Sequence, residues 1–335
     1  MNAAPFWKQA LASALVRSRR KHPATPAALE VLHRSDQPGF NDSSYLFGRG
    51  EDGTALVTRL SVRTDAPSEV WLSVRIPGRP IAHIPVQDHP QEGGWRAGGL
   101  EWTVADPGRT LHVRYAGPLL SAGVAIDSVV DLTFEGNGPL IDFSDGVDPA
   151  VTAQAIAARP WNRGFFDKLG EIRTVHYEQV GRVRGTVQLD GETHSVDLRS
   201  VRDHSFGRRQ WNTWRQHLWF SGVREDGVAF TAACIRYDFI GPLTAGFYID
   251  GEPQAVSAVT DFDAIAPSGV VPDRFTFEIT CTDGTRHVVD VEVEGIFAFD
   301  MDQGAYCIRE AIARSTVDGV PAVGICEFGW NPAHG

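Results

Sequence analysis

The chain has 335 residues, of which 42% are hydrophobic and 22% are charged, and its formal net charge is −11. A chain of this length can bury a large core without disulfides or metals, and its 34 glycines and 20 prolines are too few for a disordered composition. The acidic balance argues against nucleic acid as a partner, because a nucleic-acid-binding surface is basic.

The sequence gives no indication of membrane insertion or export. No segment approaches the roughly 20 consecutive apolar residues that a membrane helix needs. The N-terminal arginines follow the apolar residues, which is the reverse of the order in a secretory signal. We therefore expect a cytoplasmic protein without stable membrane insertion, and a homodimer is left open. The widely spaced cysteines are expected to be buried free thiols: Cys234, Cys281, Cys307 and Cys326.

The first predicted element is an amphipathic helix over residues 5–20. Trp7, Leu11 and Leu15 recur there at every fourth position. A second short helix is predicted to begin at the Thr-Pro pair at 25–26, because threonine caps free N–H groups and proline suits the first helical turn.

From about residue 40 the hydrophobic period changes to two, which predicts β-strands. Residues 56–63 and 70–76 alternate in this way, and shorter runs recur at 111–115, 130–134, 183–189 and 275–281. Many short strands with tight turns predict an all-β, mostly antiparallel fold, either a sandwich or a barrel. Asp-Gly pairs, which favour hairpin turns, fall mostly between such runs: 52–53, 190–191, 226–227, 250–251, 283–284 and 318–319.

One predicted helix, over residues 149–159, interrupts the strands near the middle of the chain. An Asp-Gly pair opens a long strand in each half, which suggests two related β domains in tandem. We expect three parts: an N-terminal helical segment over 1–35, a first β domain over 36–165 and a second β domain over 166–335.

Several well-known motifs are absent from the sequence. No Gly-x-Gly-x-x-Gly opens a helix after a strand, and the sequence contains no P-loop, no Gly-x-Ser-x-Gly and no His-Glu-x-x-His. These absences argue against dinucleotide-dependent dehydrogenases, P-loop enzymes and hydrolases with a nucleophile elbow. Polar and aromatic residues instead concentrate between residues 173 and 239.

Two segments in this region carry a resemblance to a known family. His-Tyr-Glu-Gln at 176–179 precedes Arg-Asp-His-Ser-Phe-Gly at 202–207, and Arg-Gln-Trp follows at 209–211. These segments resemble the AttH-like superfamily, which includes carotenoid 1,2-hydratase (hydroxyneurosporene synthase) and carries His-x-Trp-Gly near Arg-x-Trp. The match is closest to a bacterial branch with His-Tyr-Glu-Gln and Arg-Asp-His-Ser-Trp-Gly, and it spans roughly residues 40–330. Phe206 departs from the tryptophan of the family pattern.

The resemblance implies two lipocalin-like β-barrel domains, with the motif cluster in the second and a hydrophobic ligand site in or beside one barrel. It also implies acid–base chemistry without a cofactor, as in the hydratase that protonates a terpenoid alkene. Such chemistry needs a titratable group in apolar surroundings, where burial raises the pKa of a carboxyl toward neutrality. Aromatic rings would stabilise developing positive charge by about 0.5–2 kcal/mol each.

Asp238 is the first candidate for the acid or base. Alternation along the predicted strand places it on one face with Cys234 and Arg236. The resemblance implies a proton-donating aspartate on the strand that follows the His-x-Trp-Gly segment. The alternative is an ion pair between Asp238 and Arg236, and Arg236 is otherwise a candidate substrate-binding residue.

Asp203 and His204 are adjacent in a predicted strand, so their side chains point to opposite faces. We expect His204 to face the site as a proton carrier and Asp203 to pair with Arg202 or Arg208. The alternative for His204 is a buried, hydrogen-bonded histidine that ties two strands together.

His176 and Glu178 share one strand face, while Tyr177 lies on the other. Tyr177 as a phenolic donor and Glu178 as an acid or base join the catalytic candidates, and His176 joins the substrate-binding ones. Two alternatives stay open: a structural polar network, and a metal site completed by His204 or His217. No zinc-binding pattern is present, and no metal is expected.

Other aromatic and basic residues would shape the substrate pocket, or would plug the barrel as a guanidinium stacked on an indole. His217 and Trp219 share a face if their segment is extended, which would bring a titratable group beside an aromatic ring. The further substrate-binding candidates are Phe206, Arg208, Trp211, Trp214, His217 and Trp219.

The sequence therefore predicts a cofactor-independent lyase of hydratase, dehydratase, carbon–carbon lyase or isomerase type. It would use acid–base chemistry on a hydrophobic small molecule, such as a terpenoid, steroid, polyketide or lignin-derived phenolic. The alternative is a lipocalin-like carrier that holds an apolar ligand unchanged. An enzyme requires at least one titratable group that faces open volume beside aromatic rings, whereas a carrier does not.

Overall fold

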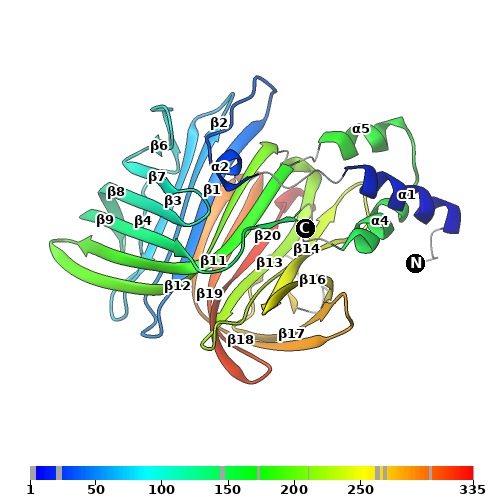
Figure 1. Cartoon of the computed structure of the whole chain (residues 1–335). Helices are drawn as coiled ribbons and strands as arrows, with labels where there is room; N and C mark the ends of the chain where they lie inside the picture. Colours follow the sequence, from blue (N-terminus) through cyan, green and yellow to red (C-terminus); the bar gives the residue numbers. More distant parts are fainter. Residues whose placement is uncertain are drawn as a thin grey trace. The chain divides into compact units, whose positions relative to one another are not determined.

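The structure is a computed structural model of the whole chain (Figure 1). It describes residues 5–19, 25–143, 148–171, 174–209, 211–260, 265–266, 270–301 and 304–334. The side chains of residues 19, 171, 212 and 334 lie outside this description.

The helices predicted from the sequence are confirmed, and so is the cap predicted at Thr25. The side chain of Thr25 accepts a hydrogen bond from the N–H of Ala28 (3.3 Å), and that of Asp148 accepts one from Ala150 (2.7 Å). α5 is not among the predicted helices, although its two buried side chains, Phe165 and Leu169, are four residues apart as on one face of a helix. The helices are α1 (Phe6–Arg19), α2 (Pro26–Leu29), α4 (Pro149–Ala157) and α5 (Arg163–Glu171).

The first sheet contains most of the strands before residue 209, and its described pairs are antiparallel. Pairing returns to its start in the order β1–β2–β3–β4–β8–β9–β11–β12–β1, so these strands form a ring. Its strands are β1 (Phe40–Arg49), β2 (Ala55–Arg63), β3 (Ser68–Arg75), β4 (Ala82–His83), β5 (Asp88–His89), β6 (Arg96–Ala97), β7 (Leu100–Asp106), β8 (Thr110–Ser121), β9 (Val124–Gly136), β10 (Ile141–Asp142), β11 (Thr174–Leu189) and β12 (Glu192–Arg208).

One face of the ring strands carries a hydrophobic core, and we call it the core face. Leu46 of β1 and Leu198 of β12 belong to this core. Side chains alternate along a strand, so Asp42 and His204, an even number of residues away, share the core face. The same alternation places Tyr177 of β11 there.

The second sheet is a closed antiparallel barrel. Leu218 and Phe220 of its first strand belong to the barrel core, so His217 and Trp219 point to the outside of the barrel. The barrel strands are β13 (Trp214–Arg224), β14 (Ala229–Tyr237), β15 (Leu243–Asp250), β16 (Glu252–Val259), β17 (Arg274–Cys281), β18 (Arg286–Met301), β19 (Tyr306–Val317) and β20 (Val320–Trp330).

The six Asp-Gly pairs predicted as turns lie where two consecutive strands are joined, as predicted, and Asp250 is the last residue of β15. Every glycine of these pairs has a positive φ, and Asp190 and Asp318 also do, both with φ of 53°. Positive φ at both central residues is the geometry of the turn that Asp-Gly favours in two-residue hairpins. The all-β, mostly antiparallel fold with a short helical N-terminus is therefore confirmed.

The chain divides into two compact units, and this division differs from the expected boundary at about residue 165. One unit contains residues 23–141 and 174–209 with the first sheet; the other contains residues 1–22, 142–173 and 210–335 with the barrel. The difference arises because β11 and β12 pair with β9 and β1, and local sequence pattern does not reveal which distant strand completes a sheet.

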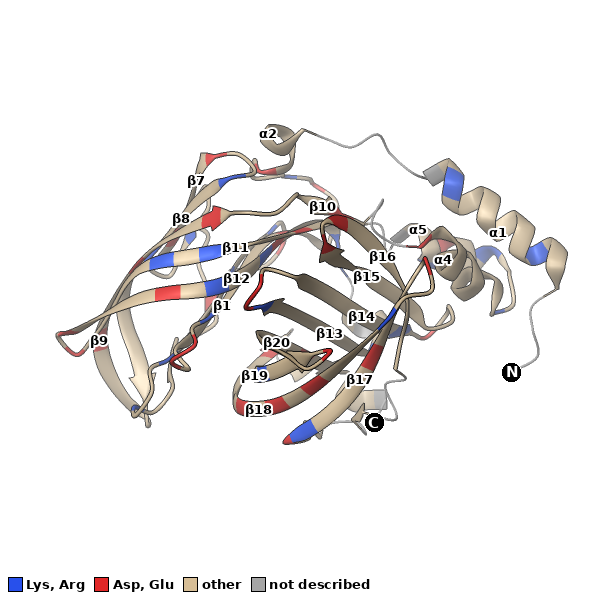
Figure 2. Ribbon diagram, turned by 60° about the horizontal axis from the view of Figure 1, so that its bottom comes forward, with Lys and Arg blue, Asp and Glu red and all other residues tan. Residues whose placement is uncertain are grey.

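Figure 2 shows basic residues on β11 beside both acidic and basic residues on β12. For example, Nη1 of Arg184 lies 2.7 Å from Oε2 of Glu135 on the neighbouring strand β9. The charges of this exposed region therefore compensate one another. None of the helices in the described part of the chain has the length and apolar character that a membrane span requires. The four cysteines are free, as predicted, but only three of them are buried, because Cys307 is partly exposed.

Candidate active site

The residues predicted for the site fall into two clusters, one in each unit. Tyr177 and His204 lie on the core face of the first sheet, whereas His217 lies on the outside of the barrel. The expectation of a single cluster in the second domain is therefore wrong. Its physical cause is the crossing of the chain between the units after β12, which separates residues 176–208 from residues 211–238.

The barrel cluster is a chain of three side chains: Glu327, His217 and Tyr306. The carboxylate of Glu327 on β20 is hydrogen-bonded to Nε2 of His217 on β13. Nδ1 of the same imidazole lies 2.6 Å from the hydroxyl of Tyr306 on β19. The histidine side chain is 1% exposed and the glutamate side chain 22% exposed, so the chain runs from the buried phenol outward to a carboxylate that solvent reaches.

Burial fixes the position of the protons in the barrel cluster. It raises the pKa of Tyr306 well above the ordinary value, so the phenol keeps its proton and donates to Nδ1 of His217. In a neutral imidazole the proton then resides on Nε2, which donates to Glu327. In this arrangement both ring nitrogens of His217 are hydrogen-bonded, and one tautomer of the neutral imidazole is favoured.

Indole rings surround the barrel cluster. Trp211 stacks on Tyr306, with ring centroids 5.1 Å apart, and Trp214 meets His217 edge to face at 5.5 Å. Trp219 is directly opposite Glu327 in the register of β13 and β20. The structure thus brings together four predicted substrate-binding residues, Trp211, Trp214, His217 and Trp219, around a carboxylate that the sequence motifs do not include.

Arg236 lies near the end of β14, and Asp238 follows the last residue of that strand. β14 ends at Tyr237, so Asp238 is outside the strand and alternation does not set its direction. Its carboxylate lies 3.6 Å from Nε of Arg215 and is 34% exposed. Arg236 donates to the side chain of Gln216 at 3.4 Å. The catalytic role of Asp238 and the substrate-binding role of Arg236 stay predictions.

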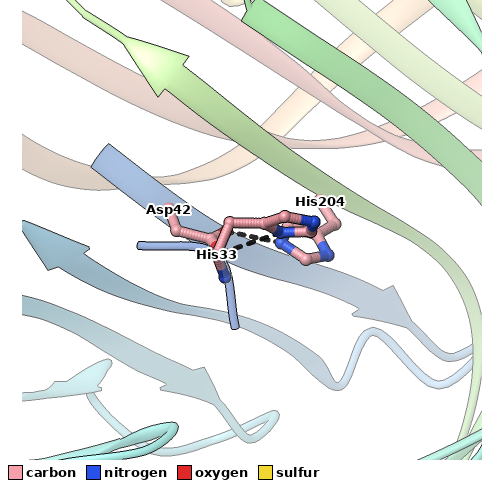
Figure 3. A group of neighbouring side chains, drawn as sticks. All are labelled: His33, Asp42 and His204. Atoms are coloured by element: carbon pink, nitrogen blue, oxygen red, sulfur yellow. Dashed lines mark hydrogen bonds and ion pairs between the residues drawn. The ribbon is translucent and has the colours of Figure 1, made fainter. Parts of the chain in front are cut away.

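The first-sheet cluster consists of His33, Asp42, Tyr177 and His204 (Figure 3 shows the first, second and fourth). Nε2 of His204 lies 2.5 Å from Oδ1 of Asp42, and its Nδ1 lies 2.7 Å from the hydroxyl of Tyr177. Burial alone would raise the pKa of Asp42, but hydrogen bonds from His204 and His33 outweigh it and hold that pKa below its usual value. His204 thus joins β12 to β1 and β11. This is the arrangement expected under the alternative hypothesis of a buried histidine that ties strands together.

A second polar group lies on the same core face beside Tyr177. Arg202 pairs with Glu30 and donates from Nε and Nη2 to Oε1 of Gln179, at 3.0 and 2.7 Å. The guanidinium also lies over the ring of Tyr177. The expected pairing of Asp203 with Arg202 is therefore wrong, because adjacent residues of β12 point to opposite faces.

His176, Glu178 and Asp203 lie on the face opposite the core face. Nε2 of His176 is 3.3 Å from Glu178, and Asp203 is directly across from Glu178 in the register of β11 and β12. Burial raises the pKa of Asp203 to about 6; His176 opposes this shift and the charge of Glu178 adds to it. Glu178 as an acid or base and His176 as a substrate-binding residue stay predictions.

Phe206 lies on the core face and stacks on His33, with centroids 3.6 Å apart and planes inclined by 12°. The ring therefore acts through its apolar surface, and the missing indole N–H is not needed there. Arg208 is the last residue of β12, opposite Phe40. Its substrate-binding role, like that of Phe206, stays a prediction.

The metal site considered from the sequence, in which His204 or His217 would complete a pair formed by His176 and Glu178, is not assembled in the structure. His176 and Glu178 point away from the face that carries His204. Among the described residues a different group can converge on one ion: His33, Asp42 and His204, whose ligand atoms all lie within 4.8 Å of one another.

Sequence reasoning missed the residues that complete both clusters: His33, Asp42, Tyr306 and Glu327. Each is a single polar residue without a motif around it. Two of them had a usable signal, since Glu327 interrupts the apolar residues of β20 and Asp42 is a charged residue within the mostly buried strand β1. Unpaired charge is not buried in such strands, so each predicts a partner elsewhere.

Solved structures share this fold. The chain is similar to a protein assigned as AttH (NE1406) from Nitrosomonas europaea, with a TM-score of 0.59 and 14% identity over 92% of this chain and 98% of that one. It is also similar to kievitone hydratase from Nectria haematococca, with a TM-score of 0.53 and 9% identity over 93% of this chain and 97% of that one. The structure of CghA with Sch210972 is similar too, with a TM-score of 0.52 and 10% identity over 92% of this chain and 98% of that one. The resemblance to the AttH-like superfamily is confirmed at the level of the fold.

Sequence comparisons add a family assignment. Among curated proteins none matches the chain. A family model described as Domain of unknown function (DUF7064) matches residues 26–332, which is most of the chain.

Proposed function

This chain belongs to the family described as Domain of unknown function (DUF7064), and we propose that it is a hydratase-like lyase acting on a hydrophobic small molecule. The observation that carries the proposal is the partly exposed carboxylate of Glu327 at the end of a buried hydrogen-bonded chain, beside indole rings. The similarity of the fold to kievitone hydratase supports this class of reaction.

Glu327 is the proposed acid and base. In the direction of hydration, the carboxylic acid gives its proton to one alkene carbon, and water adds through oxygen to the other carbon. The water then releases a proton, which restores the carboxylic acid. Dehydration is the reverse, and double-bond migration needs only the two proton transfers. A positioned acid or base typically contributes about 10²–10⁴-fold in rate.

His217 and Tyr306 are positioning residues in this proposal. The phenol donates to Nδ1 and so keeps the proton of the imidazole on Nε2, where it holds the Glu327 carboxylate in one orientation. Both rings are buried and hydrogen-bonded, so neither needs to touch the substrate.

The indoles of Trp214 and Trp219 supply the apolar side of the proposed site. Trp219 is the cross-strand neighbour of Glu327, and its ring packs against Phe143 at 5.2 Å between centroids. Aromatic faces attract positive charge through their quadrupoles, so a carbocation-like transition state would be stabilised beside them. The substrate class of terpenoids, steroids, polyketides and phenolics is proposed on this basis.

The test uses the full-length protein and a panel of terpenoid and phenolic alkenes and alcohols. Wild type is expected to convert at least one compound, and Glu327→Gln to lose about 10²–10⁴-fold of that turnover. Glu252→Gln, at the exposed start of β16, is the matched control and should keep full turnover. Turnover that survives in Glu327→Gln contradicts the site. Tight binding without conversion of any compound would instead favour the carrier.

A further inference from the structure

We infer that His33, Asp42 and His204 form a binding site for one divalent transition-metal ion in the unit that contains the first sheet. The three residues come from separate elements: the segment after α2, strand β1 and strand β12. Their ligand atoms lie within 4.8 Å of one another (Figure 3). This site is distinct from the barrel cluster and does not depend on the proposed function.

The contacts of the two ring nitrogens of His33 point to a cation. Its Nε2 lies 3.2 Å from the backbone carbonyl of Ala28, and a carbonyl only accepts hydrogen bonds. In a neutral His33 ring this contact places the proton on Nε2 and leaves Nδ1 as a lone-pair acceptor. That nitrogen lies 3.3 Å from Oδ2 of Asp42, which is also an acceptor. In that tautomer two acceptors face each other, and either a cation between them or a second proton on His33 removes the conflict.

The surroundings of His204 fit a metal ligand. Its Nδ1 is 2.7 Å from the hydroxyl of Tyr177, so Nδ1–H can donate to the phenol oxygen while Nε2 coordinates. Metal-bound histidines usually have such a partner on the other ring nitrogen, and it fixes the tautomer and the ring direction. His33 has the equivalent partner in the carbonyl of Ala28. Both imidazoles therefore already have the outer hydrogen bond that coordination requires.

The carboxylate of Asp42 lies in a closed polar environment. It accepts a hydrogen bond from the backbone N–H of His33 at 2.5 Å, and its side chain is completely buried. A buried carboxylate requires compensating positive charge, and a divalent ion supplies more of it than one imidazolium does.

The ligand set selects the class of ion. Two imidazoles and one carboxylate are the donors of Zn²⁺ and of other borderline divalent ions such as Fe²⁺ and Co²⁺, whereas Ca²⁺ and Mg²⁺ prefer sets made of oxygen alone. Three protein ligands leave at least one coordination position for water or another molecule.

The ion has a route to solvent. The His33 side chain is 22% exposed and lines a pocket of about 380 Å³. Arg34, Asp36, Arg63 and Gln91 line the same pocket. An ion can therefore exchange past His33 without opening of the first sheet, while Asp42 and His204 stay buried.

The competing occupant is a proton. If His33 is an imidazolium, its Nδ1–H donates to Asp42 and no metal is needed. The two possibilities differ in a measurement that requires no activity: only the metal site binds Co²⁺ or Zn²⁺ with one-to-one stoichiometry.

The experiment is metal binding by the full-length protein. After treatment with a chelator, the protein is titrated with Co²⁺ and with Zn²⁺ and followed by calorimetry and by the visible absorption of Co²⁺. We expect one ion per chain and a Co²⁺ spectrum of low coordination number. His33→Ala and Asp42→Asn should each weaken binding by about 10–100-fold or more.

The controls keep the result interpretable. His112→Ala removes a partly buried histidine of the same sheet, bonded to Thr133, and should leave binding unchanged. His33 lies in the segment between α2 and β1, so His33→Ala should fold even if Asp42→Asn does not. Absence of stoichiometric binding in wild type, or equal binding in wild type and His33→Ala, overturns the inference. A nitrogen NMR signal showing a doubly protonated His33 in the Zn²⁺-treated protein would also overturn it.

Discussion

The rings of His217 and Tyr306 lie nearly parallel, with planes inclined by 7°, and Nδ1 of the imidazole is 2.6 Å from the phenol hydroxyl. His204 and Tyr177 in the other unit are joined by the same pair of atoms at 2.7 Å. In both cases Nε2 of the histidine is bonded to a carboxylate, Glu327 or Asp42. The two carboxylates differ in exposure: the side chain of Asp42 is completely buried, whereas that of Glu327 is partly exposed to solvent.

Replacing Tyr306 by phenylalanine tests its positioning role. Tyr306→Phe removes the donor to Nδ1 of His217, so the imidazole can adopt either tautomer. We expect kcat to fall by about 10-fold with little change in KM, and the free energy of unfolding to fall by about 1–3 kcal/mol because a buried acceptor loses its partner. Steady-state kinetics and urea titration measure the two effects. A change in KM alone would place Tyr306 in substrate binding instead.

Gly329 gives the His217 ring its space. It is directly opposite His217 in the register of β13 and β20, and a Cβ there would lie 2.1 Å from Cε1 of the imidazole. Gly329→Ala must therefore displace the ring from Glu327 and Tyr306. We expect loss of turnover comparable to that of Glu327→Gln, in a protein that still shows β-rich circular dichroism.

The matched control for Gly329 is in α5. Gly170→Ala adds a methyl group where no atom lies within 4 Å, and alanine favours a helix. It should leave turnover unchanged and stability equal or slightly higher. Equal activity of both alanine variants would show that the position of the His217 ring is irrelevant.

The buried pair of Arg202 and Glu30 anchors the segment after α2 to the first sheet. Both side chains are almost completely buried. Arg202→Met leaves the glutamate charge buried without its partner, so we expect a loss of about 3–5 kcal/mol in the free energy of unfolding. Arg184→Met breaks an exposed pair with Glu135 and should cost less than about 1 kcal/mol. Denaturant titration of both variants checks the contrast, and equal losses would contradict it.

Tyr115 makes stability depend on pH in the alkaline range. Burial raises its pKa from 10.0 to about 12, and its hydroxyl donates to the carbonyl of Pro118 at 2.7 Å. The folded state therefore disfavours ionisation, so the stabilisation is complete below pH 10 and is lost as the pH rises from 10 to 12.

The stability of Tyr115→Phe relative to wild type should depend on pH. At pH 7 it loses the hydrogen bond and about 1 kcal/mol of stability, whereas between pH 10 and 12 its disadvantage should shrink. Guanidinium titrations of both proteins at pH 7, 10 and 11.5 measure the difference. A constant difference across these values would contradict the raised pKa.

Much of the fold follows from local sequence. Alternation predicts the strands, and Asp-Gly predicts the hairpins, because turn geometry depends on adjacent residues only. The same alternation separates His204 from Asp203 and Tyr177 from Glu178. Thr25 caps its helix for an equally local reason.

The site is harder to predict because it depends on distant pairing. His204 meets Asp42 only since β12 lies against β1, and His217 meets Glu327 only since the barrel closes between β13 and β20. The residues adjacent in sequence to Asp42 or Glu327 do not indicate which histidine it will contact. The concentration of motif residues between 173 and 239 is real in sequence, yet the chain passes from one sheet to the other within it.

The account is tested most directly by transfer of deuterium from solvent. Wild type, Glu327→Gln and Asp238→Asn are incubated in D₂O with a substrate found in the panel, and the label at the protonated carbon is measured by mass spectrometry. We predict label in the product of wild type and of Asp238→Asn, and its loss in Glu327→Gln. Label that persists in Glu327→Gln but disappears in Asp238→Asn would contradict the assignment of Glu327 as the proton carrier.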